Sequence, residues 1–123
     1  MKRRGFTLIE LIVVLAIIAT LLTLALPRYF GSVDRARETT LRQDLKVMRQ
    51  AIDQFQADLG RYPKTLDELV SRRYLAGIPL DPLTDSRESW LLLPPRDGKS
   101  EGVADIKSGA TGLALDGTAY QDW

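Results

Sequence analysis

The sequence contains no cysteine and no histidine among its 123 residues. The first absence excludes disulfides and thiol chemistry, and the two together exclude Ser-His-Asp triads and the usual zinc sites. Neither sign of charge dominates, because the chain has 17 lysines and arginines and 16 aspartates and glutamates, which give a formal net charge of +1. No nucleic-acid binding is therefore expected. An enzyme built on this chain would rely on carboxylate, lysine, serine or tyrosine chemistry, for which no spacing stands out, so no catalytic residue is assigned.

Charge is absent from one long segment except at a single position. Residues 6–26 are apolar apart from three threonines and Glu10. At about 1.5 Å of rise per residue, a helix of this length covers roughly 30 Å, the thickness of a bilayer's hydrocarbon core. The segment is predicted to span a membrane, with Thr7, Thr20 and Thr23 bonding back to carbonyl groups of their own helix. Glu10 has no visible partner in its own chain, which makes it a functional candidate.

A short basic flank, Lys2, Arg3 and Arg4, precedes the apolar segment. Such a flank is normally kept on the cytoplasmic side, so the residues after Leu26 are expected outside the cytoplasm. Residues 25–28 are a poor match to a secretory cleavage site, so cleavage is expected before the apolar segment rather than after it.

A second helical segment is predicted over residues 27–60. Pro27, followed by Gly31, predicts a hinge in which the helix kinks or locally melts, because proline removes one backbone donor and crowds the preceding turn. Beyond the hinge, apolar residues recur at spacings of four and three, which is one stripe of an amphipathic helix, and Gly60 supplies a natural end. The stripe consists of Leu41, Leu45, Met48, Ile52, Phe55 and Leu59.

The remaining residues, 61–123, are predicted to form a small globular head. Thr65 and Glu68 match a capping box, in which each side chain accepts from the backbone N–H of the other, so a short helix begins there. The predicted fold class is therefore α+β, with a small antiparallel sheet packed on the amphipathic helix. The expected strands cover residues 88–93, 103–107 and 113–115, a tight turn is expected at Asp116-Gly117, and Trp90, Tyr120 and Trp123 are the expected bulky packing groups.

The N-terminal residues carry a specific family resemblance. Lys2-Arg3-Arg4-Gly5, followed by Phe6-Thr7-Leu8-Ile9-Glu10-Leu11 and an unbroken apolar helix, resembles the signal of type IV pilins and type II secretion pseudopilins. The resemblance implies that a prepilin peptidase removes residues 1–5 as a leader by cutting between Gly5 and Phe6, and that Phe6 is N-methylated. It also implies that Glu10 pairs, during assembly, with the cationic amino group of Phe6 in a neighbouring copy.

The head extends the resemblance toward the major, G-type pseudopilins of type II secretion. Residues 62–75 and 78–82 are similar to the corresponding part of that group, whereas residues 83–87 depart from its pattern. The implied function is that of a filament subunit in the bacterial inner membrane, with its head in the periplasm. The implied partners are copies of itself, other pseudopilins, the prepilin peptidase, the lipid bilayer, and an assembly platform with its ATPase.

Two alternatives to this function stay open at the level of the sequence. One is a subunit of a type IV pilus or of a DNA-uptake pilus, and the more distant one is a membrane-tethered periplasmic enzyme or binding module. No cofactor is expected apart from calcium, which G-type pseudopilins bind in a C-terminal loop. The resemblance implies calcium candidates at Asp105, Ser108, Asp116 and Asp122, although the chain lacks the acid-dense loop of that group.

Overall fold

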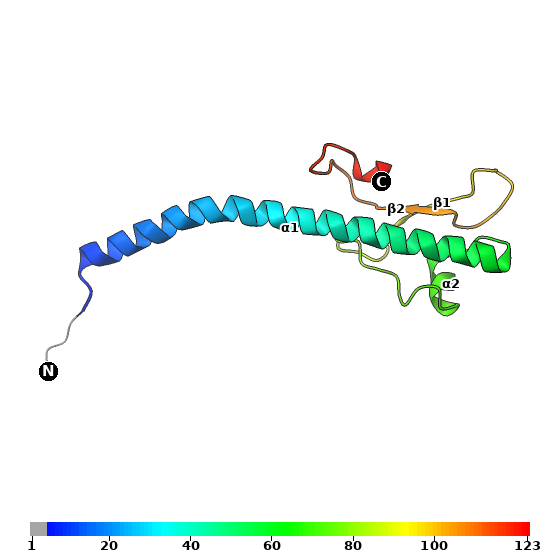
Figure 1. Ribbon diagram of the computed structural model, residues 1–123, viewed down its shortest axis with the longest axis horizontal. Helices are drawn as coiled ribbons and strands as arrows, with labels where there is room; N and C mark the ends of the chain where they lie inside the picture. The colour runs from blue at the N-terminus through cyan, green and yellow to red at the C-terminus, as the bar shows by residue number, and fades with distance from the viewer. Residues whose placement is uncertain (1–4) are drawn as a thin grey trace. The chain divides into compact units, whose positions relative to one another are not determined.

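A computed structural model describes residues 5–123 (Figure 1). The elements are α1 (Leu8–Leu59), α2 (Leu66–Ser71), β1 (Leu91–Leu93), β2 (Asp105–Lys107) and a 3₁₀ turn at Tyr120–Asp122. One long helix, one short helix and a two-stranded antiparallel sheet confirm the α+β class. The basic flank and most of the predicted leader, residues 1–4, lie outside the described residues. The chain divides after Asp34 into two compact units, each of which is described by itself.

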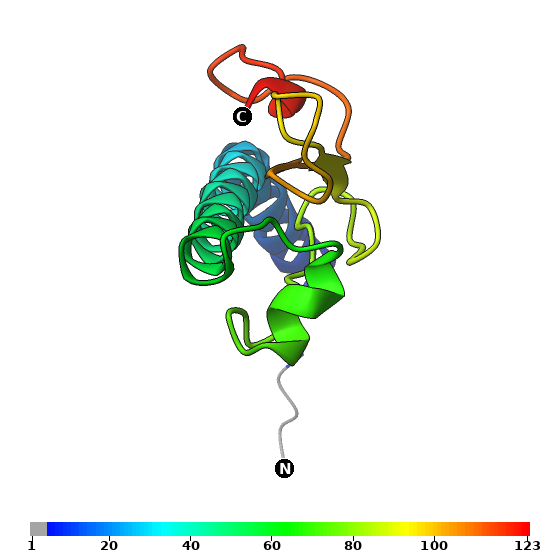
Figure 2. The ribbon, with the colours of Figure 1, turned by 90° about the vertical axis from the view of Figure 1, so that its right-hand side faces the viewer.

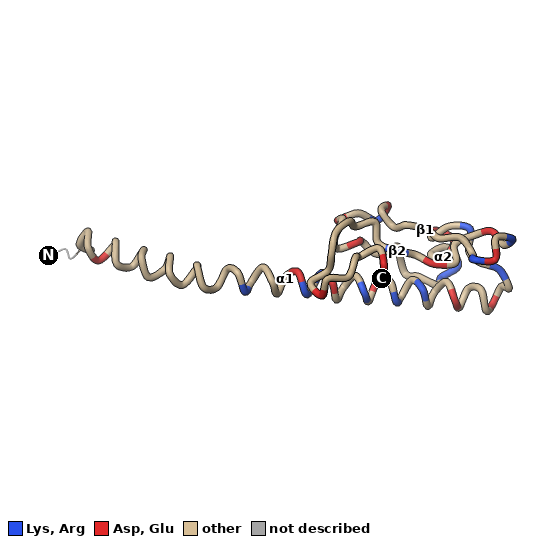
Figure 3. Tube along the Cα trace, turned by 90° about the horizontal axis from the view of Figure 1, so that it is seen from above, with Lys and Arg blue, Asp and Glu red and all other residues tan. Residues whose placement is uncertain are grey.

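The first unit contains the apolar part of α1. An 18-residue window of this helix has a mean hydropathy of 2.8, and none of the window is buried. By length and composition the helix can cross a membrane. Figure 3 shows the long uncharged stretch in the first half of α1 and the mixed charges in its second half.

The helix continues through both residues of the predicted hinge. Pro27 and Gly31 both lie inside α1, which is helical from Leu8 to Leu59. Of the two outcomes predicted at the hinge, a kink or local melting, the second is excluded because the helix continues through Pro27 although proline has no N–H to donate. Bending at this point stays a prediction.

The second unit is built on the amphipathic half of α1. Leu41, Leu45, Met48, Ile52 and Phe55 are all buried, which confirms the predicted stripe up to Phe55. The prediction is wrong for the last member of the stripe, because Leu59, the final residue of α1, is 40% exposed. Gly60 ends the helix as predicted, with a left-handed φ of 68° and its N–H donating to Gln56.

The short helix α2 begins where the capping box predicts. Thr65 Oγ1 accepts the backbone N–H of Glu68 at 3.3 Å. The reciprocal half of the box differs from the prediction, because the Glu68 carboxylate accepts the N–H of Lys64 at 3.1 Å and pairs with Arg61. Figure 2 shows α2 and the sheet side by side with the second half of α1, at different points around that helix.

The sheet is smaller than predicted. β1 and β2 pair with Leu92 opposite Ile106, and Ile106 is fully buried against the core. The predicted third strand is only an isolated bridge between Leu113 and Ala119, because the backbone here closes the expected turn, in which the Ala114 N–H donates to the Thr118 carbonyl at 2.7 Å. Gly117, with a φ of 87°, supports this turn.

The bulky aromatic residues pack as predicted. Trp90 is buried, and its Nε1–H donates to the Pro79 carbonyl at 2.9 Å. Tyr120 and Trp123 pack against the core from its edge and meet edge to face, with ring centroids 5.2 Å apart. Tyr120 and Trp123 also contact α1, because the Tyr120 hydroxyl donates to Glu38 at 3.0 Å and the Arg42 guanidinium lies 4.0 Å from the centroid of the Trp123 ring.

Candidate functional site

The residues around the predicted cleavage position lie at the start of α1. Gly5, Phe6 and Thr7 precede the helix and are exposed, and Phe6 is 88% exposed. The Thr7 carbonyl accepts the first helical hydrogen bond, from the N–H of Leu11 at 3.2 Å. The Gly5–Phe6 peptide bond is therefore outside the helix and open to solvent in this unit.

Thr7 and Glu10 form a reciprocal pair of hydrogen bonds. Thr7 Oγ1 accepts the Glu10 N–H at 3.2 Å, and the Thr7 N–H donates to Glu10 Oε2 at 3.1 Å. This is a capping box, which satisfies two of the backbone donors that a helix start leaves free.

The capping box corrects two expectations from the sequence. Glu10 does have a partner in its own chain, the backbone N–H of Thr7. Within residues 5–123, the Thr7 hydroxyl oxygen accepts the Glu10 N–H and makes no bond back to a carbonyl, whereas Thr20 and Thr23 bond back to Ala16 and Ala19 at 2.8 Å each. The Thr-x-x-Glu pattern of residues 7–10 could have predicted this capping box. It was missed because these residues were assigned to the interior of the long apolar helix.

The two carboxylate oxygens of Glu10 differ in their contacts within the described residues. In residues 5–123 its Oε2 binds the Thr7 N–H, whereas no hydrogen bond to its Oε1 is found. An ionised carboxylate has about four acceptor positions, so the capping role leaves room for a second donor. The carboxylate can therefore hold its helix start and bind a cation at the same time.

The four calcium candidates contact different partners. Asp105 pairs with Arg49 at 2.8 Å, and Ser108 donates to the buried carboxylate of Asp81. Asp116 accepts from the N–H and hydroxyl of Thr118 within its own turn, at 3.0 and 2.6 Å. Asp122 shares with Asp105 a cleft that Arg49 also lines.

The four candidates do not gather into one acidic cluster, and calcium binding by this head stays a prediction. Calcium takes six to eight oxygen ligands, and the part of the chain described here contains no group of three or more acidic side chains placed to hold a metal. The guanidinium of Arg49 occupies the place beside Asp105 that a cation would need.

A buried polar contact in the head was not anticipated from the sequence. Asp81 and Ser108 are both fully buried, and Asp81 also accepts the N–H groups of Leu83 and Thr84, at 2.9 and 3.4 Å. Three donors satisfy this carboxylate without a cation. Burial together with the charge of Asp81 raises the pKa of the neighbouring Asp44 carboxyl.

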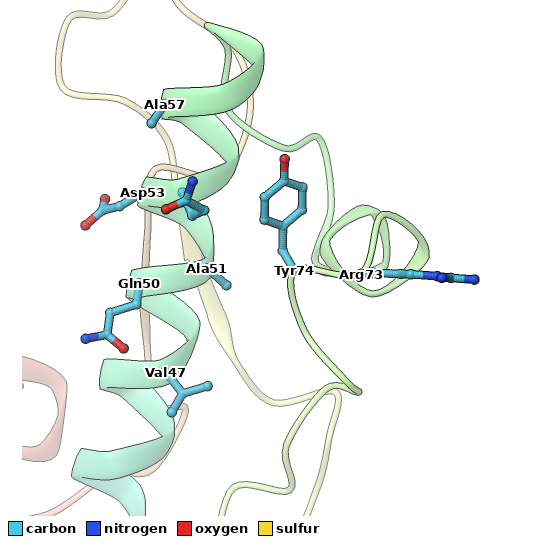
Figure 4. Close-up of a pocket in the computed structure, with 8 residues that line it drawn as sticks. Val47, Gln50, Ala51, Asp53, Ala57, Arg73 and Tyr74 are labelled. Carbon is cyan, nitrogen blue, oxygen red and sulfur yellow. The ribbon is translucent and has the colours of Figure 1, made fainter.

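A groove of about 820 Å³ lies between α1 and the segment after α2 (Figure 4). Tyr74 turns its ring toward α1, whereas Arg73 extends away from it (Figure 4). The hydroxyl of Tyr74 donates to Asp58 at 2.8 Å, which gives this tyrosine a structural role. The lining consists of Val47, Gln50, Ala51, Asp53, Gln54, Ala57, Arg73 and Tyr74, a set with one carboxylate and no nucleophile paired with a base.

Two family models match successive parts of the chain. The prokaryotic N-terminal methylation motif matches residues 1–26, and the family model of type II secretion system (T2SS), protein G, matches residues 28–86. No solved structure gives a significant match.

Several curated relatives are named type II secretion system core protein G. The one from Aeromonas hydrophila is 32% identical over 139 residues, covering 98% of this chain and 90% of the relative. The one from Pseudomonas aeruginosa is 34% identical over 101 residues, covering 67% of this chain and 71% of the relative. The one from Dickeya chrysanthemi is 30% identical over 114 residues, covering 80% and 73% respectively.

Proposed function

The chain belongs to the type II secretion system protein G family, and we propose that it is made as an inner-membrane precursor and assembled into a periplasmic pseudopilus that drives protein export. Its role is mechanical. The ATPase that powers assembly is a separate cytoplasmic protein acting through an inner-membrane platform, since the sequence carries no phosphate-binding glycine loop of its own.

The proposal rests on the exposed, non-helical backbone of residues 5–7 just before α1. A prepilin peptidase cuts the exposed bond between Gly5 and Phe6, and the new amino terminus at Phe6 is methylated. The methylation motif over residues 1–26 supports this processing. The basic residues Lys2, Arg3 and Arg4 hold the leader in the cytoplasm, so the head lies in the periplasm.

Assembly then pairs Glu10 of one copy with the Phe6 amino group of the next. The amine stays cationic after methylation, and a carboxylate opposite it removes an isolated charge from an apolar bundle of helices. Oε1 of Glu10 accepts the amine while Oε2 keeps the Thr7 N–H. Because Phe6 lies just before the helix and Glu10 lies in its first turn, the pair fixes the stagger between neighbouring helices.

A deletion strain complemented with variants tests the proposal. Loss of the gene should abolish export of secreted proteins and leave twitching and DNA uptake intact. The reverse pattern would assign the chain to a type IV or DNA-uptake pilus. Gly5→Trp should leave the precursor uncut.

Glu10 needs a separate variant because its pairing with the Phe6 amine follows cleavage. Glu10→Ala keeps the backbone N–H that Thr7 Oγ1 accepts, so it should still be cleaved, but it should not assemble, as measured by crosslinking between copies in membranes. Asp34→Ala removes an exposed acid from the same helix and is the matched control, expected to assemble normally. Normal assembly of Glu10→Ala would refute the pairing.

A further inference from the structure

The start of α1 is set by one threonine. Thr7 is the last residue before the helix, its carbonyl accepts from Leu11, and its hydroxyl oxygen accepts from the N–H of Glu10. These are the features of an N-cap residue, and Glu10 completes the box from the third helical position by accepting the Thr7 N–H. The position of the helix start is therefore encoded in these two side chains.

The cap competes directly with growth of the helix toward the N-terminus. If α1 began one residue earlier, the carbonyl of Phe6 would accept the N–H of Glu10, which is the donor that Thr7 Oγ1 now holds. Growth by one more residue would pair the Gly5 carbonyl with the N–H of Ile9. Only one arrangement can exist at a time.

Loss of the cap would favour the longer helix. At the edge of a bilayer the free N–H groups of the first turn have little water to bond with, and a missing partner is costly there. The carbonyls of Gly5 and Phe6 are the nearest replacements. The Gly5–Phe6 bond would then enter a helix, where its carbonyl is engaged and its backbone is no longer extended.

We propose that Thr7 is a positioning residue for precursor cleavage, because its capping box with Glu10 keeps the Gly5–Phe6 bond in non-helical backbone that the peptidase can bind. This inference rests on the proposed function. Hydrolysis adds water across that amide, leaving a carboxylate on Gly5 and the amino group on Phe6. Exposed non-helical backbone is the form in which chains are preferentially cut.

The test measures cleavage of the full-length precursor in lipid vesicles by a prepilin peptidase, with mass spectrometry of the released product. Thr7→Val removes the hydroxyl but keeps the shape, and its kcat/KM should fall about five-fold, the equivalent of a cap worth about 1 kcal/mol. Thr7→Ser retains a capping hydroxyl and should stay within about two-fold of the native chain.

The matched control is Thr20→Val, which makes the same chemical change within the helix, where the hydroxyl donates only to Ala16. It should be cleaved at the native rate. Native-rate cleavage of Thr7→Val would overturn the inference.

A second readout separates helix position from direct recognition of the side chain. Carbon chemical shifts of Gly5 and Phe6 in the labelled precursor should move toward helical values in Thr7→Val and stay unchanged in Thr7→Ser. Slow cleavage of Thr7→Val without this change would also overturn the inference. A native precursor that is not cut between Gly5 and Phe6 would refute the proposed function, and the chemical shifts would still decide whether Thr7 sets the helix start.

Discussion

Arg49 of α1 donates from Nε to Oδ1 of Asp105 at 2.8 Å and so joins the long helix to β2. The Nη2 atom of the same guanidinium donates to the carbonyls of Ile106 and Trp123, at 2.9 and 2.7 Å. One side chain thus holds the helix, the second strand and residue 123 together. A planar guanidinium can serve three acceptors in fixed directions, which the single ammonium of lysine cannot reproduce.

Replacing Arg49 should therefore loosen the head. We expect Arg49→Ala to lower the free energy of unfolding by about 2 kcal/mol, since partly buried hydrogen bonds to a charged group are lost. Arg49→Lys should recover only part of that loss. Tryptophan fluorescence of the full-length chain in detergent reports on the head, because Trp90 and Trp123 are the two tryptophans.

The control for this change is Arg35→Ala on the same helix. Among the described residues the Arg35 side chain has no hydrogen-bond partner, and its substitution should change stability by less than about 0.5 kcal/mol. An equal loss in both variants would show that Arg49 acts only through its charge.

The elements that were predicted correctly are those whose sequence pattern lies within a few neighbouring residues. The stripe from Leu41 to Phe55 follows from helical spacing alone, and Thr65 caps α2 through a residue three positions away. The contact of Asp81 with Ser108 spans 27 residues. No local pattern encodes such a pair, because each residue is equally consistent with an ordinary turn.

The contacts at the start of α1 were predicted only in part. Gly5, Phe6 and Glu10 were selected as candidates from a local motif, but the capping contact of Thr7 was missed although its signal is equally local. A threonine in an apolar segment has two common uses, bonding back to a carbonyl or capping. The two uses differ only in where the helix begins, which the apolar pattern does not specify.

Glu68 should make the stability of the head depend on pH. Hydrogen bonds from Arg61 and from the Lys64 N–H, in that order of importance, lower the pKa of Glu68 from 4.5 to about 2. A lowered pKa in the folded state adds stability above pH 4.5 that is lost as the pH falls toward 2.

The variant that tests this dependence is Glu68→Gln. Its melting temperature should be below the native value at pH 7, and the difference should shrink as the pH falls from 4.5 toward 2. In an Arg61→Gln background the same substitution should have a smaller effect. A difference that does not change with pH would contradict the assignment.

Gly109 is expected to tolerate no side chain. A Cβ at this position would overlap the carbonyl oxygen of Ser89, which belongs to the backbone and cannot rotate away. Gly109→Ala should therefore lower the free energy of unfolding by about 1–3 kcal/mol. Gly77→Ala is the matched control, because a Cβ there meets no atom within 4 Å, and it should leave the melting temperature almost unchanged.

Chelation should leave the head unaffected. A metal bound only to the folded state raises the melting temperature, so its removal lowers that temperature. Asp105 is already paired with Arg49, and Asp116 is bonded within its own turn. We expect the same melting temperature in EDTA and in excess calcium, and a calcium-dependent rise would require a donor set different from the one seen here.

Asp44 should produce the opposite pH dependence from Glu68. Burial, and secondly the charge of Asp81, raise the pKa of Asp44 above 3.8. The folded chain then binds this proton more tightly than the unfolded chain, so this contribution to stability is present below pH 3.8 and is lost as the pH rises through the folded-state pKa.

Asp44→Asn removes a charge that is unfavourable at pH 7, and its melting temperature should exceed the native value there. The gap should narrow as the pH falls toward 3.8, because the native carboxyl then becomes neutral as well. Asp53→Asn removes the same charge from an exposed position of α1, and an equal gain in that variant would show that net charge, rather than the burial of Asp44 and its proximity to Asp81, is responsible.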